Sequence, residues 1–270
     1  MMYNLLQGKK GIIFGALDEK SIAWKTAIRC NEEGAQIILT NAPIAMRMGE
    51  INKLAEQINA PVISCDISSN EDVANLITKS MEHFAGGVDF ILHSVGMSLN
   101  IRKGKHYTEI DYGFNAKTLD ISAMSLHRLL ATCLKMDAIN EWGSVVALSY
   151  IAAQRVFPDY NEMADAKALL ESVGRSFGYH YGTKKKVRIN TISQSPTRTT
   201  AGSGVKGFDG FMSYAEKMSP LGNASAEDCA NYCVTLFSDM TRMVTMQNLF
   251  HDGGFSFTGV SQAVVEQMEK

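Results

Sequence analysis

The sequence lacks three features that would each indicate a special class of protein: paired cysteines, an excess of charge of one sign, and a long apolar run. Its five cysteines are an odd number scattered over 270 residues, unlike the pattern of a disulfide-stapled domain. Lysine plus arginine number 26 and aspartate plus glutamate 28, so no field is present that would hold nucleic acid. Apolar residues make up 46% and charged residues 20%, which is typical of a folded globular chain.

No apolar run approaches the roughly 18 residues that a membrane span needs. The N-terminal stretch Met1–Gln7 is also too short for a secretory signal. These absences predict an unprocessed cytoplasmic protein with no membrane or nucleic-acid partner.

Cys229 and Cys233 stand one helical turn apart, but no neighbouring histidine or second cysteine pair completes a zinc set. We therefore expect no metal and interpret these two as buried thiols on a helix face.

Short apolar runs recur along the chain, and stretches with helical periodicity separate them. The runs begin at residues 11, 36, 61, 88, 143, 187 and 248, and the helical stretches include 21–33 and 70–84, each followed by glycine. Near-continuous apolar strands that alternate with helices indicate a parallel sheet covered on both faces. The sequence therefore predicts an α/β, doubly wound Rossmann fold of about seven parallel strands flanked by helices. No linker divides residues 1–270, which we expect to form one domain.

In such a sheet the ligand lies beyond the carboxyl ends of the strands, so the residues that follow each strand are informative. After the first strand, Gly15 can take positive φ, and Ser21 can cap a helix whose free N–H groups suit a pyrophosphate. Many turns of this kind hold no ligand. The strict dinucleotide fingerprint is also absent, because Trp24 and Lys25 stand where further glycines are usual.

The next three strands are followed by weaker signals. Thr40–Ala42 offers neither the acid that accepts a ribose 2′-hydroxyl nor the arginine that accepts a 2′-phosphate. Asp66 could take the adenine amino group with Ile67 against the ring edge, or Asp66 could simply cap a helix. In the run from His93 to Gly96, the glycine would let backbone contact the nicotinamide ribose, and we interpret His93 as a packing residue rather than a base.

The residues that could carry chemistry follow the fifth strand. Tyr150 comes just after it, and Tyr160 is expected to open a long helix that runs to about Tyr181. Residues seven apart on a helix lie about 20° from one face, so Tyr160, Met163 and Lys167 would share that face. An ammonium beside a phenol favours the phenolate, which makes the pair a plausible proton donor with electrostatic support. An amphipathic helix with an ordinary tyrosine remains the alternative.

After the sixth strand, hydroxyls and backbone amides between Ser193 and Thr200 suit a carboxamide and a diphosphate. The segment that follows, Gly202–Met212, has four glycines among bulky apolar residues. That composition is typical of a mobile lid with an apolar underside. We therefore predict a substrate-binding lid at about 199–218, with a glycine-tolerant surface loop as the alternative.

Together these motifs resemble one family across nearly the whole chain: the NADH-dependent enoyl-acyl-carrier-protein reductases, a divergent branch of the short-chain dehydrogenase/reductases. The specific element is the spacing of Tyr160 and Lys167, since ordinary members of the superfamily place the lysine four residues after the tyrosine, where this chain has Ala164. The other matching motifs are Gly15 with Ser21–Ala23, His93–Gly96, Tyr150, Pro196–Thr199 and His251–Gly254.

The resemblance implies reduction of trans-2-enoyl thioesters on acyl carrier protein, the last step of each fatty-acid elongation cycle. It implies a homotetramer with NADH rather than NADPH as cofactor. The catalytic residues would be Tyr150, Tyr160 and Lys167. The cofactor residues would be Gly15, Ser21, Ile22, Ala42, Asp66, Ile67, Val95, Gly96, Lys167, Thr197, Arg198, Thr199, Thr200 and Ala201. The substrate residues would be Ser98, Met163 and Phe208.

Three positions depart from the family pattern: Lys25, Ala42 and Ser195 stand where a glycine, a glutamine and a glycine are common. The adenosine contacts are therefore the weakest part of the resemblance. Two other functions stay open on the residues alone: a short-chain dehydrogenase acting on a carbonyl or an alcohol, and a nucleotide-binding Rossmann module without catalysis.

Overall fold

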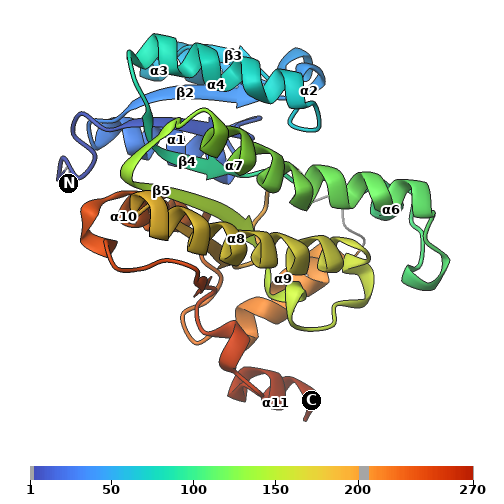
Figure 1. Cartoon of the computed structure of the whole chain (residues 1–270). Helices are drawn as coiled ribbons and strands as arrows, with labels where there is room; N and C mark the ends of the chain where they lie inside the picture. Colours follow the sequence, from blue (N-terminus) through green and yellow to red (C-terminus); the bar gives the residue numbers. More distant parts are fainter. Residues whose placement is uncertain (1–2, 201–206, 270) are drawn as a thin grey trace.

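The structure, a computed structural model, describes residues 3–200 and 207–269. Its strands form one sheet in the order β3-β2-β1-β4-β5-β6-β7 (Figure 1), and every neighbouring pair is parallel. The strands are β1 (Lys10–Phe14), β2 (Gln36–Asn41), β3 (Val62–Ser64), β4 (Val88–His93), β5 (Ile139–Ser149), β6 (Arg188–Gln194) and β7 (Asn248–His251). The predicted doubly wound fold is confirmed, and its strand order reverses between β1 and β4.

Helices connect the strands. The α-helices are α1 (Ile22–Glu32), α2 (Pro43–Met48), α3 (Ile51–Ile58), α4 (Asn70–Phe84), α5 (Leu99–Arg102), α6 (Tyr112–Leu119), α7 (Ser125–Lys135), α8 (Met163–Lys185), α9 (Phe208–Met218), α10 (Ala226–Phe237) and α11 (Gln262–Met268). Short turns of other helical types are η1 (Tyr107–Glu109), η2 (Asp120–Met124), η3 (Ile151–Ala153), η4 (Pro158–Tyr160), η6 (Asp239–Thr241) and η7 (Phe255–Phe257).

The sheet is covered on both faces, which explains why its strands are apolar on both sides. Helices α4, α7 and α8 pack on one face, and α1, α3 and α10 pack on the other. Successive residues of a strand point to opposite faces, so Ile12 enters the first layer and Ile13 the second. The five cysteines are all free and buried, as expected. Within the described ranges, no helix has both the length and the apolar character needed to cross a membrane.

Most predicted helix ends are confirmed. Ser21 caps α1 by accepting the N–H of Trp24, as predicted. Ser225 and Asp228 form a capping box at α10. The end of α4 differs from the prediction, because the residue in the left-handed conformation there is Ala85, with φ of 51°, and not a glycine.

The start of the long helix after β5 was predicted wrongly. Helix α8 begins at Met163, and Tyr160 lies before it in the short turn η4. The interruption is at Asn161, whose φ of 52° is incompatible with a continuous right-handed helix. The Asn161 amide donates to the backbone oxygen of Lys105 at 2.8 Å, which holds this conformation. Tyr160 and Lys167 therefore do not share one helical face.

One helical rod was not predicted. Helices α6 and α7 run end to end between β4 and β5, joined by the π-helical turn η2. Leu126, Leu129, Leu130 and Cys133 all face the core from α7. That spacing is the signal from which the helix could have been found.

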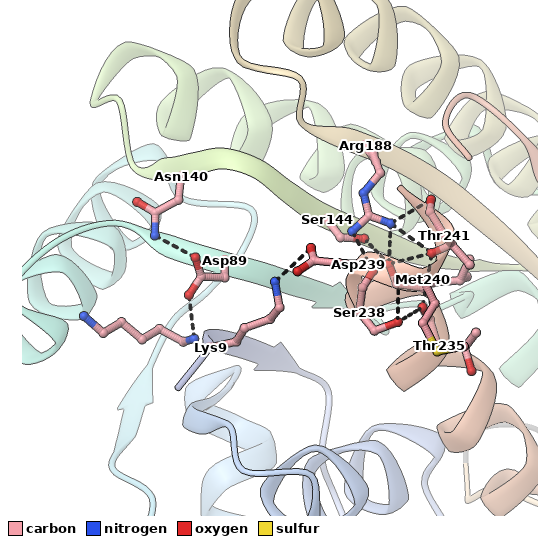
Figure 2. A network of polar contacts seen from close by, with 12 residues as sticks. Lys9, Asp89, Asn140, Ser144, Arg188, Thr235, Ser238, Asp239, Met240 and Thr241 are labelled. Carbon is pink, nitrogen blue, oxygen red and sulfur yellow. Dashed lines mark hydrogen bonds and ion pairs between the residues drawn. The ribbon is translucent and has the colours of Figure 1, made fainter. Parts of the chain in front are cut away.

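The amino ends of the strands are closed by polar contacts (Figure 2). Arg188, 2% exposed, donates to the backbone oxygens of Leu236 at 2.8 Å, Thr241 at 3.1 Å and Ser238 at 3.2 Å. Lys9 pairs with Asp239 at 3.2 Å nearby. These bonds tie the chain after α10 to the end of the sheet opposite the carboxyl edge, where the predicted site lies.

Candidate active site

The predicted site lies where the carboxyl ends of β1, β4, β5 and β6 meet. β1 and β4 are adjacent, and their following residues touch: a Cβ on Gly15 would lie 1.9 Å from the backbone oxygen of Ser94. Gly15 also has φ of +92°. Only glycine fits this turn, because both the conformation and the close approach exclude a side chain. The order of the strands reverses at this point, which is where ligands bind in doubly wound sheets.

Two tyrosines meet at the carboxyl edge of the sheet. Tyr150 directly follows β5, Tyr160 ends η4, and their ring centroids are 5.0 Å apart. Tyr150 is 8% exposed, and among the described residues its buried hydroxyl has no hydrogen-bond partner. Burial raises the pKa of both phenols above their ordinary value, with a further contribution from Tyr160 and Asp252 at Tyr150. Both hydroxyls therefore keep their protons near neutral pH and can donate hydrogen bonds.

Aromatic rings surround the pair. Phe157 lies 5.4 Å and Phe211 6.3 Å from the Tyr150 ring, measured between centroids. Phe255 extends the cluster, 6.2 Å from Phe211. The cluster presents an apolar wall to whatever binds beside the tyrosines, and the same wall desolvates their hydroxyls.

Lys167 lies buried on α8 and is bonded to the end of β5, the strand that Tyr150 follows. Its Nζ donates to the backbone oxygen of Leu148 at 2.7 Å, and no other partner for the ammonium occurs among the described residues. Burial lowers its pKa to about 8, against an opposing attraction from Glu171. The ammonium is thus still charged at neutral pH and has further N–H groups that a ligand could use.

Gly96 marks the place for that ligand. A Cβ on Gly96 would lie 3.9 Å from Cε of Met163 and 4.0 Å from Nζ of Lys167. Gly96 is exposed and Val95 half-buried, so the backbone after β4 faces Lys167 with no side chain between them. The structure therefore brings Gly96, from the motif after the fourth strand, close to Met163 and Lys167, which the sequence placed on one helix face.

Glu162 was not found by sequence reasoning. Its side chain is fully buried and accepts the hydroxyl of Ser98 at 2.6 Å and that of Thr118 at 3.0 Å. Ser98 also caps α5 by accepting the N–H of Ile101 at 3.0 Å. With its hydroxyl engaged twice, Ser98 has only backbone groups to offer a substrate, as the resemblance implies. Glu162 thus joins the segment after β4 to the start of α8.

Glu171 is a second missed residue. It is buried, and it accepts the hydroxyl of Ser149 at 2.7 Å and the amide of Gln154 at 3.2 Å. These bonds fix the end of β5 against α8, the helix that carries Lys167. Tyr150 directly follows this end of β5. The carboxylate one helical turn after Lys167 was the available signal.

The segment after β6 approaches the turn after β1. The hydroxyl of Thr200 bonds to the carboxylate of Asp18, three residues before Ser21. Ser21 itself donates to the backbone oxygen of Asp18 at 2.8 Å. Ile22, the first residue of α1, is half-buried. The predicted diphosphate residues of the two segments therefore lie near one another.

Two neighbouring predictions are met less directly. Arg198 pairs with Asp209 at 2.6 Å and so is engaged by α9, whereas Thr197 donates to the backbone oxygen of Ser195 at 2.9 Å. Ala201, and the lid prediction between 201 and 206, lie outside the described residues. Phe208 opens α9 half-buried, but the α9 side chain packed on Tyr150 is Phe211.

The residues predicted to bind adenosine form the least defined part of the site, because several of them make other contacts. Ala42 is half-buried at the start of α2. Asp66 accepts both the backbone N–H and the hydroxyl of Ser68, and the cap of α4 is Ser69 instead. Ile67 is 6% exposed in the core. Lys25, a departure from the family pattern, pairs with Glu227 at 2.9 Å.

His93 is a packing residue, as interpreted from the sequence. It is fully buried, and its Nε2 lies 2.9 Å from the hydroxyl of Ser125. Burial and the nearby Lys167 lower its pKa to about 3, so it stays neutral and cannot act as a base near pH 7.

These features fit a nicotinamide dinucleotide. The carboxyl edge of the sheet has a glycine turn before a helix, bare backbone at Gly96 and a buried ammonium near Gly96 with unused donors. The buried hydroxyl of Tyr150 has no hydrogen-bond partner among the described residues. A buried hydroxyl without a partner is costly, and a bound molecule could supply that partner.

Comparisons with known proteins agree with this geometry. Residues 15–256 match the family described as enoyl-(acyl carrier protein) reductase. The NADH-dependent enoyl-acyl-carrier-protein reductase FabI of Aquifex aeolicus (strain VF5) is 35% identical over 95% of this chain and 94% of its own. The corresponding protein of Rickettsia bellii (strain RML369-C) is 33% identical over 98% and 100%. The crystal structure of a FabI–NADH complex from Alistipes finegoldii is 64% identical, covers 97% of this chain and 92% of its own, and superposes with a TM-score of 0.96.

Proposed function

The chain belongs to the enoyl-acyl-carrier-protein reductase family, and on that premise we propose how its residues carry out the family's reaction. It is an NADH-dependent oxidoreductase that reduces the double bond of trans-2-enoyl thioesters held on acyl carrier protein, the last step of each round of fatty-acid elongation. Family membership decides against the carbonyl reductase and the non-catalytic module that the residues alone left open.

The observation that carries the mechanism is the contact between the rings of Tyr150 and Tyr160. The buried Lys167 is bonded to Leu148, two residues before Tyr150. When bound, the cofactor supplies the hydride that is added to C3 of the enoyl group. Negative charge then develops on the thioester oxygen, two carbons away, and a donor fixed there lowers the barrier. The Tyr160 hydroxyl takes this role because burial keeps it protonated, and Tyr150 flanks the same oxygen.

Lys167 holds the nicotinamide ribose. Its ammonium faces Gly96 across a gap with no side chain and has donors in reserve beyond its bond to Leu148. The remaining cofactor contacts that we assign are Gly15, Ser21, Ile22, Ala42, Asp66, Ile67, Val95, Thr197, Arg198, Thr199, Thr200 and Ala201.

Met163, the backbone of Ser98 and Phe208 line the acyl side. The packing of Phe211 on Tyr150 supports an apolar lid at about 199–218, within one domain that spans residues 1–270. Such a lid would be cleaved by protease in the free protein and protected when NAD and substrate are both present. Equal cleavage in the two states would argue against it. We also propose a cytoplasmic homotetramer, whose mass light scattering would report.

A substrate comparison tests the function. Purified protein should oxidise NADH with crotonyl thioester and leave a 3-keto thioester untouched. Faster oxidation with the keto thioester would make the chain a carbonyl reductase, and no oxidation with either would remove the enzymatic assignment.

A further inference from the structure

A cluster of cationic side chains lies on the loop that is bonded to Asn161, next to Tyr160, and has no role in the mechanism above. Between Ser98 and Thr108 the chain carries Arg102, Lys103 and Lys105 and no acidic residue. All three are exposed, and within the described ranges none pairs with a carboxylate. We call residues 102–106 the basic loop. The whole chain has a net charge of −2, so the positive charge of the basic loop is a local feature and not a property of the whole surface.

The basic loop is held in a defined shape. Asn100, fully buried, exchanges two hydrogen bonds with the backbone of Asp111, at 2.9 and 3.2 Å. Its own backbone oxygen accepts the N–H of Lys105 at 3.0 Å. The Lys103 ammonium lies 5.0 Å from the centroid of Phe114. A partner therefore meets cations whose backbone is already ordered, which lowers the entropy lost on binding.

The loop is also attached to the catalytic segment. The Asn161 amide, next to Tyr160, donates to the backbone oxygen of Lys105 at 2.8 Å. Tyr107, just after the loop, donates to Asp165 on α8 at 3.1 Å. Figure 1 shows this part of the chain, just before α6, on the same side of the molecule as the start of α8. A macromolecule bound to the loop would thus sit beside the tyrosines, within reach of a substrate on a flexible arm.

The other described rim of the site offers no comparable charge. On α9, Asp209 is paired with Arg198 at 2.6 Å, and Lys217 donates to Gln267 at 2.6 Å. The remaining charged residue of α9, Glu216, is acidic. An anionic partner would therefore be drawn to the basic loop and not to α9.

We infer that the basic loop docks a carboxylate-rich face of the acyl carrier protein that delivers the thioester. The inference rests on the proposed function, which supplies the identity of the partner. Three unpaired cations spread over exposed side chains suit a protein surface better than a single phosphate. Charges at the rim of an interface act mainly on the association rate and make it sensitive to salt.

The test reverses charge in the loop and compares substrates with different arms. The variants are Lys105→Glu and the triple Arg102→Glu, Lys103→Glu, Lys105→Glu. The substrates are crotonyl-acyl-carrier-protein, crotonyl phosphopantetheine and crotonyl-N-acetylcysteamine, which has neither protein nor phosphate. The matched control is Lys184→Glu, an exposed lysine at the far end of α8, roughly 30 Å from its start at 1.5 Å per residue.

We expect the triple variant to lower kcat/KM for the protein-linked substrate by about tenfold or more at low ionic strength, with Lys105→Glu intermediate. Added salt should lower the wild-type value and raise that of the triple variant, because it screens an attraction in the first protein and a repulsion in the second. Turnover of the N-acetylcysteamine thioester, NADH affinity and the Lys184→Glu control should all stay at wild-type levels.

Several outcomes would overturn the inference. An unchanged kcat/KM for the protein-linked substrate means that the carrier docks elsewhere. An equal loss with crotonyl phosphopantetheine means that the basic loop binds the phosphate of the phosphopantetheine arm and not the carrier protein. An equal loss with the N-acetylcysteamine thioester means that the loop shapes the site instead of receiving a partner. Failure of wild type to reduce any of the three would contradict the proposed function itself.

Discussion

Replacing Lys167 with methionine should stabilise the cofactor-free protein while destroying its cofactor site. Methionine has a similar length and helix propensity, so the substitution mainly removes the charge. Burial lowers the pKa of Lys167 from 10.5 to about 8. Because a tenfold change in an ionisation constant is worth about 1.4 kcal/mol, holding the ammonium charged in the fold costs about 3 kcal/mol at neutral pH. The variant also loses the hydrogen bond to Leu148, which lowers its stability by about 1 kcal/mol.

The net expectation for Lys167→Met is therefore a gain of about 2 kcal/mol in the free energy of unfolding at pH 7. Its pH dependence follows from the direction of the shift. Below pH 8 the lysine is charged in both states and the folded state bears the full cost. Between about pH 8 and 10.5 the unfolded chain binds more protons, so wild-type stability rises with pH. The advantage of the variant should therefore shrink to about zero near pH 10.

Urea unfolding of both proteins at one protein concentration, from pH 7 to pH 10, measures this difference. The exposed Lys184→Met on the same helix is the control and should stay within about 0.5 kcal/mol of wild type. Saturating NADH should stabilise wild type and leave Lys167→Met unaffected. If Lys167→Met is no more stable than wild type at pH 7, or if its advantage does not change with pH, the desolvation argument is refuted.

Three further outcomes are expected. Tyr160→Phe should lower kcat/KM for enoyl thioesters by roughly 10²-fold or less and leave the Kd for NADH near normal; a full rate with the variant would assign the donor to Tyr150. Gly96→Ala should weaken NADH binding in a fluorescence titration at unchanged Tm, because its Cβ makes only ordinary contacts, 3.9 Å being the shortest. NADH should exceed NADPH in kcat/KM, since no arginine or lysine lies between Thr40 and Met46; a preference for NADPH would contradict this.

The sheet could be predicted from sequence because its signals are local. Each strand is an apolar run, and Ser21, Ser69 and Ser225 mark helix starts through bonds to residues three positions on. Right-handed crossovers then give a doubly wound sheet with helices on both faces. The predicted site residues were chosen on the same ground, since topology alone brings the residues that follow the strands to one edge.

The interior of the site could not be predicted, because its determinants are distant in sequence. Glu162 finds its hydroxyl partners 64 and 44 residues away, in Ser98 and Thr118. A charged residue near a helix start otherwise indicates a solvated position. The misplaced start of α8 has a similar origin: the bond that holds Asn161 at φ of 52° comes from Lys105, 56 residues earlier. Local periodicity contains no information on such contacts.

The all-parallel sheet has a consequence for the order in which the protein matures on the ribosome. β1 lies in the middle of the sheet, between β2 and β4, so the first strand to be synthesised waits for β4 before both its edges are paired. Tyr150, Tyr160 and Lys167 leave the ribosome later, and the partner strand of β5, β6, later still. A nascent chain can thus form the glycine turn at Gly15 long before its catalytic groups exist. Long-range pairing of this kind folds slowly and leaves strand edges exposed meanwhile, so this enzyme should depend on chaperones during synthesis more than a protein of local contacts does.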